Sequence, residues 1–294
     1  MRIEYVLSLG AAFVYAICMV FIKESIRQGA GILRSTFILH TVMALVFLPL
    51  LAINPTIQPN APWLAPIGVG LSVFLGQIFI LWALKFGDPS VQTPVMGVKS
   101  TMVAIFVCFI GGAHIPLAWW LGGLLSLVAI YFLSYSEGSH LLKRSNTLTI
   151  LLTFLGASFL GLGDVIMEKT AASFGEIPFL VVSVLSCAIA SLALVPFFEG
   201  PLLAMPKASI KWALWGSALY GLEAIAFYIA ISFYGQATAI NVLYSSRGLW
   251  SIFVVWAMAY FFNYKPNPVS SAVLLRRGLG TVLLFIAILL VIFA

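Results

Sequence analysis

Charged residues are scarce in this chain of 294 residues, where they make up 8% of the sequence against 62% hydrophobic residues. Soluble domains contain about 25% charged and about 45–50% apolar residues, so a soluble fold is excluded. A helix that crosses the hydrocarbon core of a membrane needs about 20 apolar residues, and ten such helices use about 200 residues. The remaining ~94 residues are too few for a folded soluble domain beside the connections. The composition therefore predicts an integral membrane protein embedded in a lipid bilayer.

Residue types that carry catalytic or cofactor chemistry are also rare. The cysteines lie inside apolar runs and the histidines lack the spacing of metal ligands; these residues are Cys18, Cys108, Cys187, His40, His114 and His140. No glycine-rich loop followed by Lys and Ser or Thr is present, so ATP hydrolysis by this chain is excluded. The lack of a soluble domain excludes a nucleic-acid partner. We therefore predict a protein that is not an enzyme and that uses no cofactor and no metal.

Long apolar runs, separated by turn residues such as Asn54-Pro55, fill the chain. Because lipid offers the backbone no hydrogen-bond partners, continuous apolar runs of this length are predicted to be helices. The predicted helices lie at 4–22, 33–53, 63–84, 91–110, 115–134, 148–168, 178–198, 211–233, 238–262 and 276–293. The expected fold class is an all-α integral membrane protein with ten transmembrane helices.

The second half of the chain repeats the first at a nearly constant offset. Matches at an offset of 146 or 148 residues include Gly10 with Gly156, Lys23 with Lys169, Gly29 with Gly175, Pro55 with Pro201, and Gly87 with Gly235. The matches predict two five-helix units, residues 1–140 and 141–294, in one compact bundle. Because five is odd, the second unit starts from the opposite side of the membrane, so the two units are inverted repeats. Such repeats place a binding site at their interface near the midplane, which is the geometry of alternating access.

Positive residues outside the apolar runs gather on one side of the predicted membrane. The connections on that side hold Lys23, Arg27, Lys85, Lys143, Arg144, Lys207, Lys211, Lys265, Arg276 and Arg277, with Arg34 close by. The other side holds only Arg2 and Lys169. The positive-inside rule predicts that the first side is cytoplasmic and that both termini are non-cytoplasmic. A competing interpretation assigns some of these cations to the path of a substrate.

Two positive side chains are predicted near the midplane. At a rise of about 1.5 Å per residue, Lys99 lies about 12 Å into the helix 91–110, and Arg247 about 13 Å into the helix 238–262. They are 148 residues apart, which is the offset of the repeat, so inversion predicts that they face each other across the pseudo-axis. We predict that Arg247, as a planar fork, and Lys99, as a mobile point charge, bind a carboxylate or phosphate of a substrate. The alternative is that acids neutralise both cations and that the pairs only fix the packing.

Other side chains on these two helices share the faces of the cations. Further substrate-binding candidates are Gln92, Met96, Tyr244, Trp250 and Ser251. Tyr244 and Ser251 lie three residues before and four residues after Arg247, so helical periodicity brings them to one face. Trp250 is a candidate for an apolar wall of the site, although core packing is the default interpretation.

Glu223 and Asp164 are the acids expected to act with these cations. Glu223 lies about 18 Å into the helix 211–233. It is either a fixed counter-ion to Lys99 or Arg247, or a group that couples transport to protons. Asp164 is a second candidate counter-ion. Together with Glu168, one turn further on, it either gates the mouth of the site or marks a solvated helix end.

The five-plus-five pattern resembles the drug/metabolite transporter superfamily, specifically its EamA-like branch, over essentially the whole chain. The turn Ala83-Leu84-Lys85-Phe86-Gly87 is similar to the A-L-K-Y-G turn common before the fourth helix of that family. The segment Gly10-Ala11-Ala12-Phe13 is similar to its small-residue opening. The chain departs from the family at 111–114 and 263–265, where an expected Gly-Glu is missing, and at Arg247, where many relatives are apolar.

The resemblance implies a carrier of amino acids and related metabolites, and the basic residues are similar to those of relatives that carry phosphorylated sugars. We predict a secondary transporter, either exporter or exchanger, in a bacterial plasma (inner) membrane, as a monomer or homodimer. Its substrate is a small anionic or zwitterionic metabolite: an amino acid, an organic acid or a phosphorylated compound. One alternative is an exporter of cationic or apolar compounds in which Glu223 is the key group. Another is an intramembrane enzyme or lipid scramblase.

Overall fold

The computed structural model of the chain describes residues 2–86, 92, 95–112, 114–133, 144–251, 253–254 and 271–294. Every regular element within these ranges is a helix, which confirms the all-α fold class. Seven of the described helices are long and apolar enough to cross a membrane, and two shorter apolar helices, Val98–Ile110 and Leu117–Leu133, accompany them. The expected boundary between the units, at residues 140 and 141, lies outside the described residues.

The helices follow the predicted apolar runs closely. They are α1 (Ile3–Ser25), α2 (Ile32–Phe47), α3 (Leu64–Phe86), α5 (Val98–Phe106), α6 (Leu117–Leu133), α7 (Arg144–Phe174), α8 (Glu176–Ala190), α9 (Lys207–Tyr234), α10 (Ala237–Tyr244) and α12 (Ser271–Ile292). α7 is longer than predicted, because it begins before residue 148 and continues past 168. Its 31 residues span about 46 Å, so its ends extend beyond a hydrocarbon core of about 30 Å.

The two helices that carry the predicted cations are interrupted rather than continuous. A turn at Gly97 precedes α5, and a turn at Ser245 and Ser246 follows α10. The backbone has nearly the same conformation at the two breaks, with φ −61° and ψ −23° at Gly97 and φ −61° and ψ −18° at Ser245. The hydroxyl of Ser245 donates a hydrogen bond to the carbonyl of Asn241 at 3.0 Å, and such bonds to the preceding turn bend helices.

Two glycines with positive φ end the first long helix of each half. Gly29 has φ 96° in the π-helical segment Ile26–Ala30 that continues α1. Gly175 has φ 106° between α7 and α8. Only glycine adopts this region at little steric cost. The helices that follow are alike as well, because α2 and α8 both continue into 3-10 segments, Leu48–Ala52 and Ser191–Phe197.

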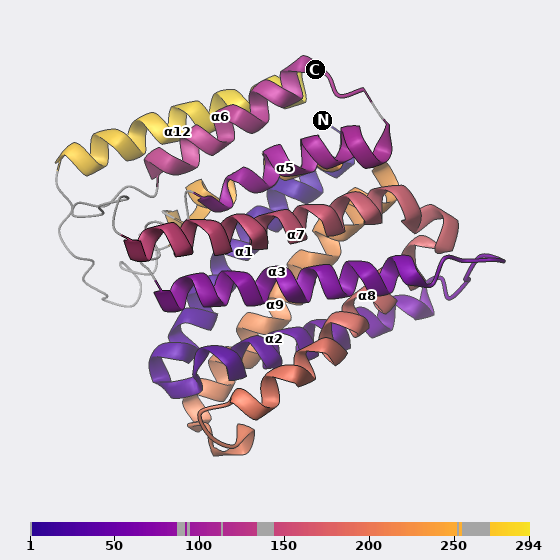
Figure 1. Cartoon of the computed structure of the whole chain (residues 1–294), viewed down its shortest axis with the longest axis vertical. Helices are drawn as coiled ribbons and strands as arrows, with labels where there is room; N and C mark the ends of the chain where they lie inside the picture. The colour runs from indigo at the N-terminus through magenta and orange to yellow at the C-terminus, as the bar shows by residue number, and fades with distance from the viewer. Residues whose placement is uncertain are drawn as a thin grey trace.

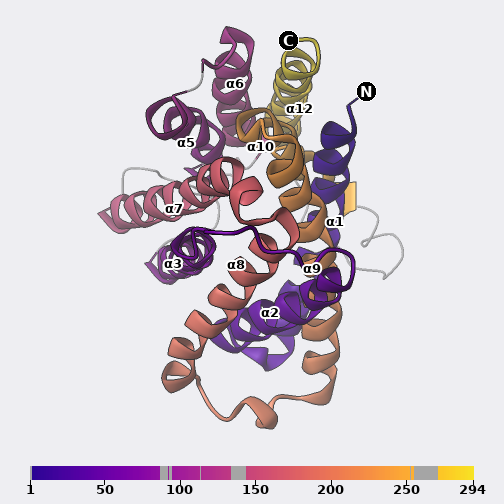
Figure 2. The ribbon, with the colours of Figure 1, turned by 90° about the vertical axis from the view of Figure 1, so that its right-hand side faces the viewer.

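Glycines set the closest contacts between helices. A Cβ atom on Gly76 of α3 would lie 3.0 Å from the carbonyl oxygen of Gly156 on α7, and one on Gly156 would lie 2.9 Å from that of Gly76. The backbones therefore touch where these helices lie side by side (Figures 1 and 2). Similarly, Gly216 of α9 lies directly against Ile22 of α1. At one edge of the bundle α6 and α12 pair with each other (Figure 2).

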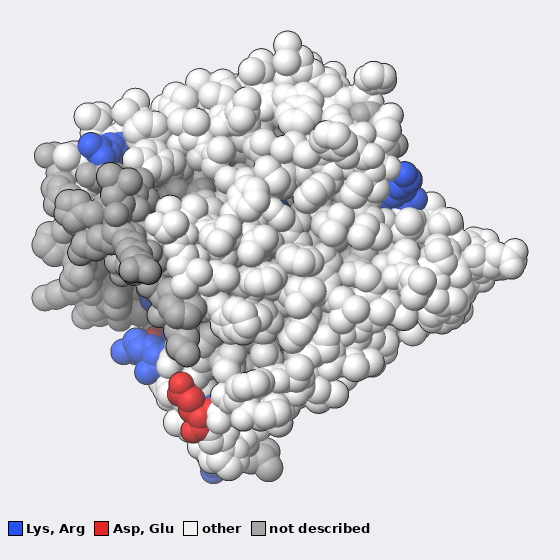
Figure 3. Space-filling model, in the orientation of Figure 1, with Lys and Arg blue, Asp and Glu red and all other residues white. Residues whose placement is uncertain are grey.

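Charged side chains gather near the two ends of the helices on the face shown in Figure 3, and a broad uncharged band lies between them. This distribution is the one expected of a protein that spans a bilayer. Both termini lie at the same end of the bundle (Figure 1), which we call the terminus side. Gln236, at the junction of α9 and α10, also lies there, because its Oε1 accepts hydrogen bonds from Arg2 and Tyr5.

Candidate functional site

Lys99 forms a buried ion pair with Asp164. It is the second residue of α5, directly after the turn at Gly97, and its Nζ lies 2.8 Å from Oδ2 of Asp164 on α7. Both residues are more than nine-tenths buried. The ammonium also lies 5.0 Å from the ring centroid of Phe227 on α9, within the range of a cation–π contact. One of the two cations predicted to bind substrate is therefore already paired with an acid of the bundle.

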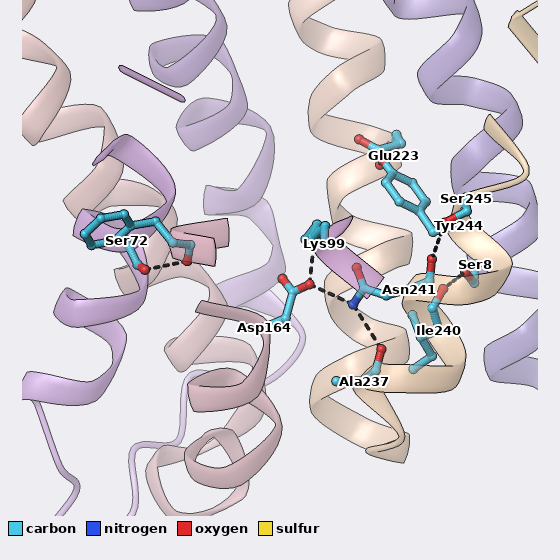
Figure 4. A network of polar contacts seen from close by, with 11 residues as sticks. Ser8, Ser72, Lys99, Asp164, Glu223, Ala237, Ile240, Asn241, Tyr244 and Ser245 are labelled. Atoms are coloured by element: carbon cyan, nitrogen blue, oxygen red, sulfur yellow. Dashed lines mark hydrogen bonds and ion pairs between the residues drawn. The ribbon is translucent and has the colours of Figure 1, made fainter. Parts of the chain in front are cut away.

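The same carboxylate oxygen of Asp164 holds a third helix. Nδ2 of Asn241 on α10 donates to Oδ2 of Asp164 at 2.8 Å and to the carbonyl of Ala237 at 3.0 Å. Figure 4 shows the ammonium of Lys99 and the amide of Asn241 both directed at this carboxylate. Asp164 thus connects α5, α7 and α10, and removing one partner of such a buried pair costs about 3–5 kcal/mol.

Arg247 lies against two tyrosine rings. Its guanidinium carbon is 4.9 Å from the ring centroid of Tyr15 on α1 and 4.8 Å from that of Tyr244. A planar guanidinium stacks well on aromatic faces and keeps its edge donors free for a planar anion. The side chain is partly buried. Among the described residues no carboxylate oxygen lies within 4.0 Å of it, so this cation lacks the close ion pair that Lys99 has.

Glu223 is the second buried acid of the site. It lies on α9 with 3% of its surface exposed, and its Oε1 accepts a hydrogen bond from the hydroxyl of Tyr244. The charges of Arg247 and Lys99 both act on its carboxyl group. Tyr244 therefore contacts an acid through its hydroxyl and a cation through its ring.

Aromatic rings separate the two cations. Phe227 contacts the ammonium of Lys99 with its ring, and Tyr244 contacts the guanidinium of Arg247 with its ring. These two rings pack against each other at a centroid distance of 4.4 Å. Tyr244 also contacts Tyr15 at 5.8 Å. Lys99 and Arg247 thus reach one cluster, but a pair of rings lies between them. We define the central cluster as Tyr15, Lys99, Asp164, Glu223, Phe227, Asn241, Tyr244 and Arg247.

The other predicted residues contact the cluster less directly. Gln92 donates from Nε2 to the carbonyl of Ile80 on α3 at 2.6 Å, and Ile80 packs against Gly156, about 12 Å from Asp164 along α7. Ser251 is exposed, and its hydroxyl bonds to the carbonyl of Gly248 in its own helix. The ring of Trp250 packs against Phe13 at a centroid distance of 5.1 Å, with its buried Nε1 unpaired. Met96, partly buried, precedes the turn at Gly97.

Asn241 is the one polar member of the cluster that sequence reasoning missed. It is an amide inside an apolar run, four residues before Ser245 and three before Tyr244, and this isolation within predicted lipid-spanning sequence was the available signal.

The cluster presents both signs of charge and aromatic surface in one buried place. Its two cations and two acids come from α5, α7, α9 and the segment after α10, and the rings of Tyr15 and Phe227 complete it. Within the described ranges no three His, Cys, Asp or Glu side chains are grouped so that they could hold a metal ion. The arrangement is suited to reversible binding of a charged molecule.

Comparisons with known proteins concern the family and the fold of this chain. No curated protein matches the chain in a search by sequence. A solved structure titled only "Crystal structure of protein" has a TM-score of 0.77 and 17% identity, and the match covers 98% of each chain. At that identity the likeness shows the fold alone. The model of the EamA-like transporter family matches residues 2–135. The resemblance of this multi-pass membrane protein to that family is thereby confirmed over these residues.

Proposed function

We propose that the chain forms two inverted five-helix units, residues 1–140 and 141–294, with ten transmembrane helices in all. Two pairs of local features support the duplication at the offsets of 146 and 148 residues. Gly29 and Gly175 both have positive φ, and the helix breaks at Gly97 and Ser245 have matching backbone angles. The family model ends at residue 135, close to the proposed boundary.

The pairing of helices between the halves also supports the inverted relation. The most extensive contacts of the described helices are those of α1 with α9 and of α3 with α7. Exchanging the units, so that α1 replaces α7 and α9 replaces α3, converts one contact into the other. The contacts of α2 with α9 and of α3 with α8 form a second such pair. A two-fold relation of this kind gives a carrier two nearly equivalent states, one open to each side.

The protein is a secondary transporter that moves a small anionic or zwitterionic metabolite by alternating access around the central cluster. The observation that carries this proposal is the charge arrangement of the cluster, in which Arg247 contacts the rings of Tyr15 and Tyr244 without a close carboxylate. Buried charges in membrane helices are costly and mark substrate or ion pathways. Arg247 is the primary ligand of the substrate anion, and Lys99 is the second, exchanging Asp164 for the substrate.

An experiment on whole cells tests this function. Metabolites inside and outside cells are compared with and without the chain, and the molecule whose distribution changes is then used in vesicle transport assays. Arg247→Met is expected to lower its transport at least about tenfold, since each 1.4 kcal/mol of binding is a factor of ten. Lys169→Met is the matched control, because Lys169 bonds to the carbonyl of Ile110 away from the cluster. Equal transport by Arg247→Met and Lys169→Met would contradict the proposal.

The alternative substrate class is a cationic or apolar compound, and the hydrogen bond between Tyr244 and Glu223 beside the aromatic rings supports it. On this alternative Glu223 binds the cation or exchanges it for a proton. Glu223→Gln then abolishes transport while Arg247→Met spares it. On the main proposal Arg247→Met is the more damaging change, so the two variants together distinguish the substrate classes.

The membrane is a plasma (inner) membrane, and the terminus side is non-cytoplasmic. Most cations of the predicted connections belong to the opposite end, which the positive-inside rule assigns to the cytoplasm. The protein acts as a monomer or homodimer, because the central cluster is built from one chain.

A further inference from the structure

The half-helix α10 is enclosed on every side. All eight of its residues, Ala237–Tyr244, are buried, although the helix is a short segment between two turns. It lies between α1 and α7, and it reaches from the terminus side of the bundle to the central cluster. α10 therefore occupies the space between the terminus side of the bundle and the central cluster.

Two acids of α7 hold α10 along its length. Oε1 of Glu168 accepts the backbone N–H of Ala237 at 3.1 Å, at the first residue of α10. One turn along both helices, Oδ2 of Asp164 accepts Nδ2 of Asn241 at 2.8 Å. A carboxylate at a helix N-terminus is favourable because it satisfies a free N–H and complements the helix dipole. The two bonds therefore act as one latch between α7 and α10.

The N-terminal part of α1 holds the opposite side of α10. The hydroxyl of Tyr5 donates to Oε1 of Gln236 at 3.2 Å, and the hydroxyl of Ser8 donates to the carbonyl of Ile240 at 2.8 Å. Gln236 has φ 64°, a left-handed conformation that residues other than glycine rarely adopt. The junction before α10 is thus fixed in a strained conformation by its neighbours.

The sequence of the first half lacks the acids and the N–H group of this latch at the corresponding positions. The residues 146 positions before Asp164 and Glu168 are Cys18 and Ile22, neither of which carries a charge. The residue 148 positions before Ala237 is Pro89, which has no N–H to donate. The latch is therefore a property of one half, and the two sides of the carrier are held differently.

We propose that α10 is the gate of the terminus side and that Asp164, Glu168 and Asn241 are positioning residues that keep it closed in the empty carrier. Asp164 connects the gate to the site, because one oxygen holds both Asn241 of α10 and the ammonium of Lys99. A ligand anion that withdraws Lys99 leaves this carboxylate buried without its cation. Opening α10 admits water to it, so loading the site favours opening of the terminus side. This coupling rests on the proposed function; the latch itself does not.

Cysteine labelling tests the latch without any substrate. Thr238 of α10 is 1% exposed and its hydroxyl has no hydrogen-bond partner, so Thr238→Cys places a thiol behind the gate. The full chain carries this change with Cys18, Cys108 and Cys187 replaced by alanine, in vesicles exposed to a membrane-impermeant maleimide on the terminus side. Glu168→Ala is expected to raise the labelling rate about tenfold, as for loss of a charge-assisted hydrogen bond.

Glu176→Ala is the matched control, because Glu176 is an acid at the same end of α7 and α8 that does not hold α10. An unchanged rate in Glu168→Ala, or an equal rise in Glu176→Ala, overturns the latch. If Glu168→Ala does not fold, Glu168→Gln, which keeps an acceptor oxygen, is expected to raise the rate about threefold. No rise in that variant also overturns the proposal.

The coupling has its own test in the same assay. Lys99→Met mimics withdrawal of the ammonium and is expected to raise labelling of Thr238→Cys several-fold in the absence of substrate. Lys99→Met with Asp164→Asn removes the stranded charge while an amide still bonds to Asn241, so protection is expected to return. A raised rate in the double variant, or none in Lys99→Met, contradicts the coupling. Failure of metabolite transport alone would contradict the proposed function and leave the latch intact.

Discussion

At the scale of single residues, one carboxylate oxygen organises the centre of this protein. Oδ2 of Asp164 accepts from Lys99 and from Asn241, each at 2.8 Å, while the ring of Phe227 covers the ammonium. A buried ion pair stabilises the fold little more than a pair of apolar side chains would. Removing one partner, however, leaves the other charge buried without compensation, which is strongly destabilising. The partners of this oxygen are therefore more sensitive to single than to paired substitution.

The first prediction concerns the stability of this ion pair. Lys99→Met is expected to lower the free energy of unfolding by about 3–5 kcal/mol, because the carboxylate of Asp164 stays buried without its cation. Lys99→Met with Asp164→Leu should recover most of this loss. Unfolding of the purified protein by denaturant in detergent measures both. A double variant that is less stable than the single one would contradict the explanation.

The second prediction separates the roles of two tyrosines that stack on Arg247. Tyr244→Phe keeps the ring but removes the hydroxyl that bonds to Glu223, so stability should fall by about 1–3 kcal/mol. Tyr15→Phe also keeps the ring and should change stability by less than about 0.5 kcal/mol. Thermal unfolding of the two variants in detergent provides the comparison, and equal losses would argue against the bond to Glu223.

Sequence reasoning placed Lys99 and Arg247 near each other because it used only the helix rise and the proposed repeat. It did not predict that Asn241 donates a hydrogen bond to Asp164, or that the ring of Phe227 lies between the two cations. Those contacts depend on the rotation and crossing of the helices, which are set by where small residues let backbones touch. Gln92 was assigned to the face of Lys99 from a continuous helix, which the turn at Gly97 interrupts.

At the scale of elements, the interrupted helices and the glycine crossings determine how the site is built. Each cation lies beside a turn: Lys99 is the second residue after Gly97, and Arg247 directly follows Ser245–Ser246. The breaks were not predicted, because glycine and serine are common within membrane helices and often remain helical there. The run of apolar residues indicates where a helix lies but not whether its axis is continuous.

The third prediction uses two glycines that match at the offset of 146 residues. Gly156→Ala places a Cβ atom against the backbone of α3, so stability should fall by about 1–3 kcal/mol. Gly10→Ala, at the corresponding position of the first half, meets nothing within 4 Å and should be neutral or gain about 0.5–1 kcal/mol from helix propensity. Denaturant unfolding of both variants measures the difference, and similar effects would exclude the close crossing.

At the scale of the whole molecule, the terminus side and the opposite end differ in charge and in the way they are held. Described cations such as Lys23 of α1 and Lys207 of α9 lie at the opposite end, whereas the latch of α10 lies towards the terminus side. The all-α fold class followed from composition alone. A chain with so few charges lies in a bilayer, and a bilayer allows few kinds of backbone structure because lipid offers no hydrogen-bond partners. The asymmetry of the latch depends on Asp164, Glu168 and Pro89. A match of the two halves at a constant offset does not reveal such single differences.

The fourth prediction concerns orientation. Asn60 lies between α2 and α3 at the terminus side, and Lys207 begins α9 at the opposite end. In the cysteine-free chain in intact cells, Asn60→Cys should react with an impermeant maleimide added outside, while Lys207→Cys should react only after the membrane is permeabilised. The reverse pattern would place the termini in the cytoplasm.

The reciprocal contact of Gly76 and Gly156 has a consequence for motion. Where two backbones touch, neither helix can approach further, and separation would open a void that lipid tails cannot fill well. If one five-helix unit tilts against the other, this crossing is the natural fulcrum. The distance between spectroscopic probes placed beside this crossing should be the same in every state. The distance between probes placed near Gln236 should change the most.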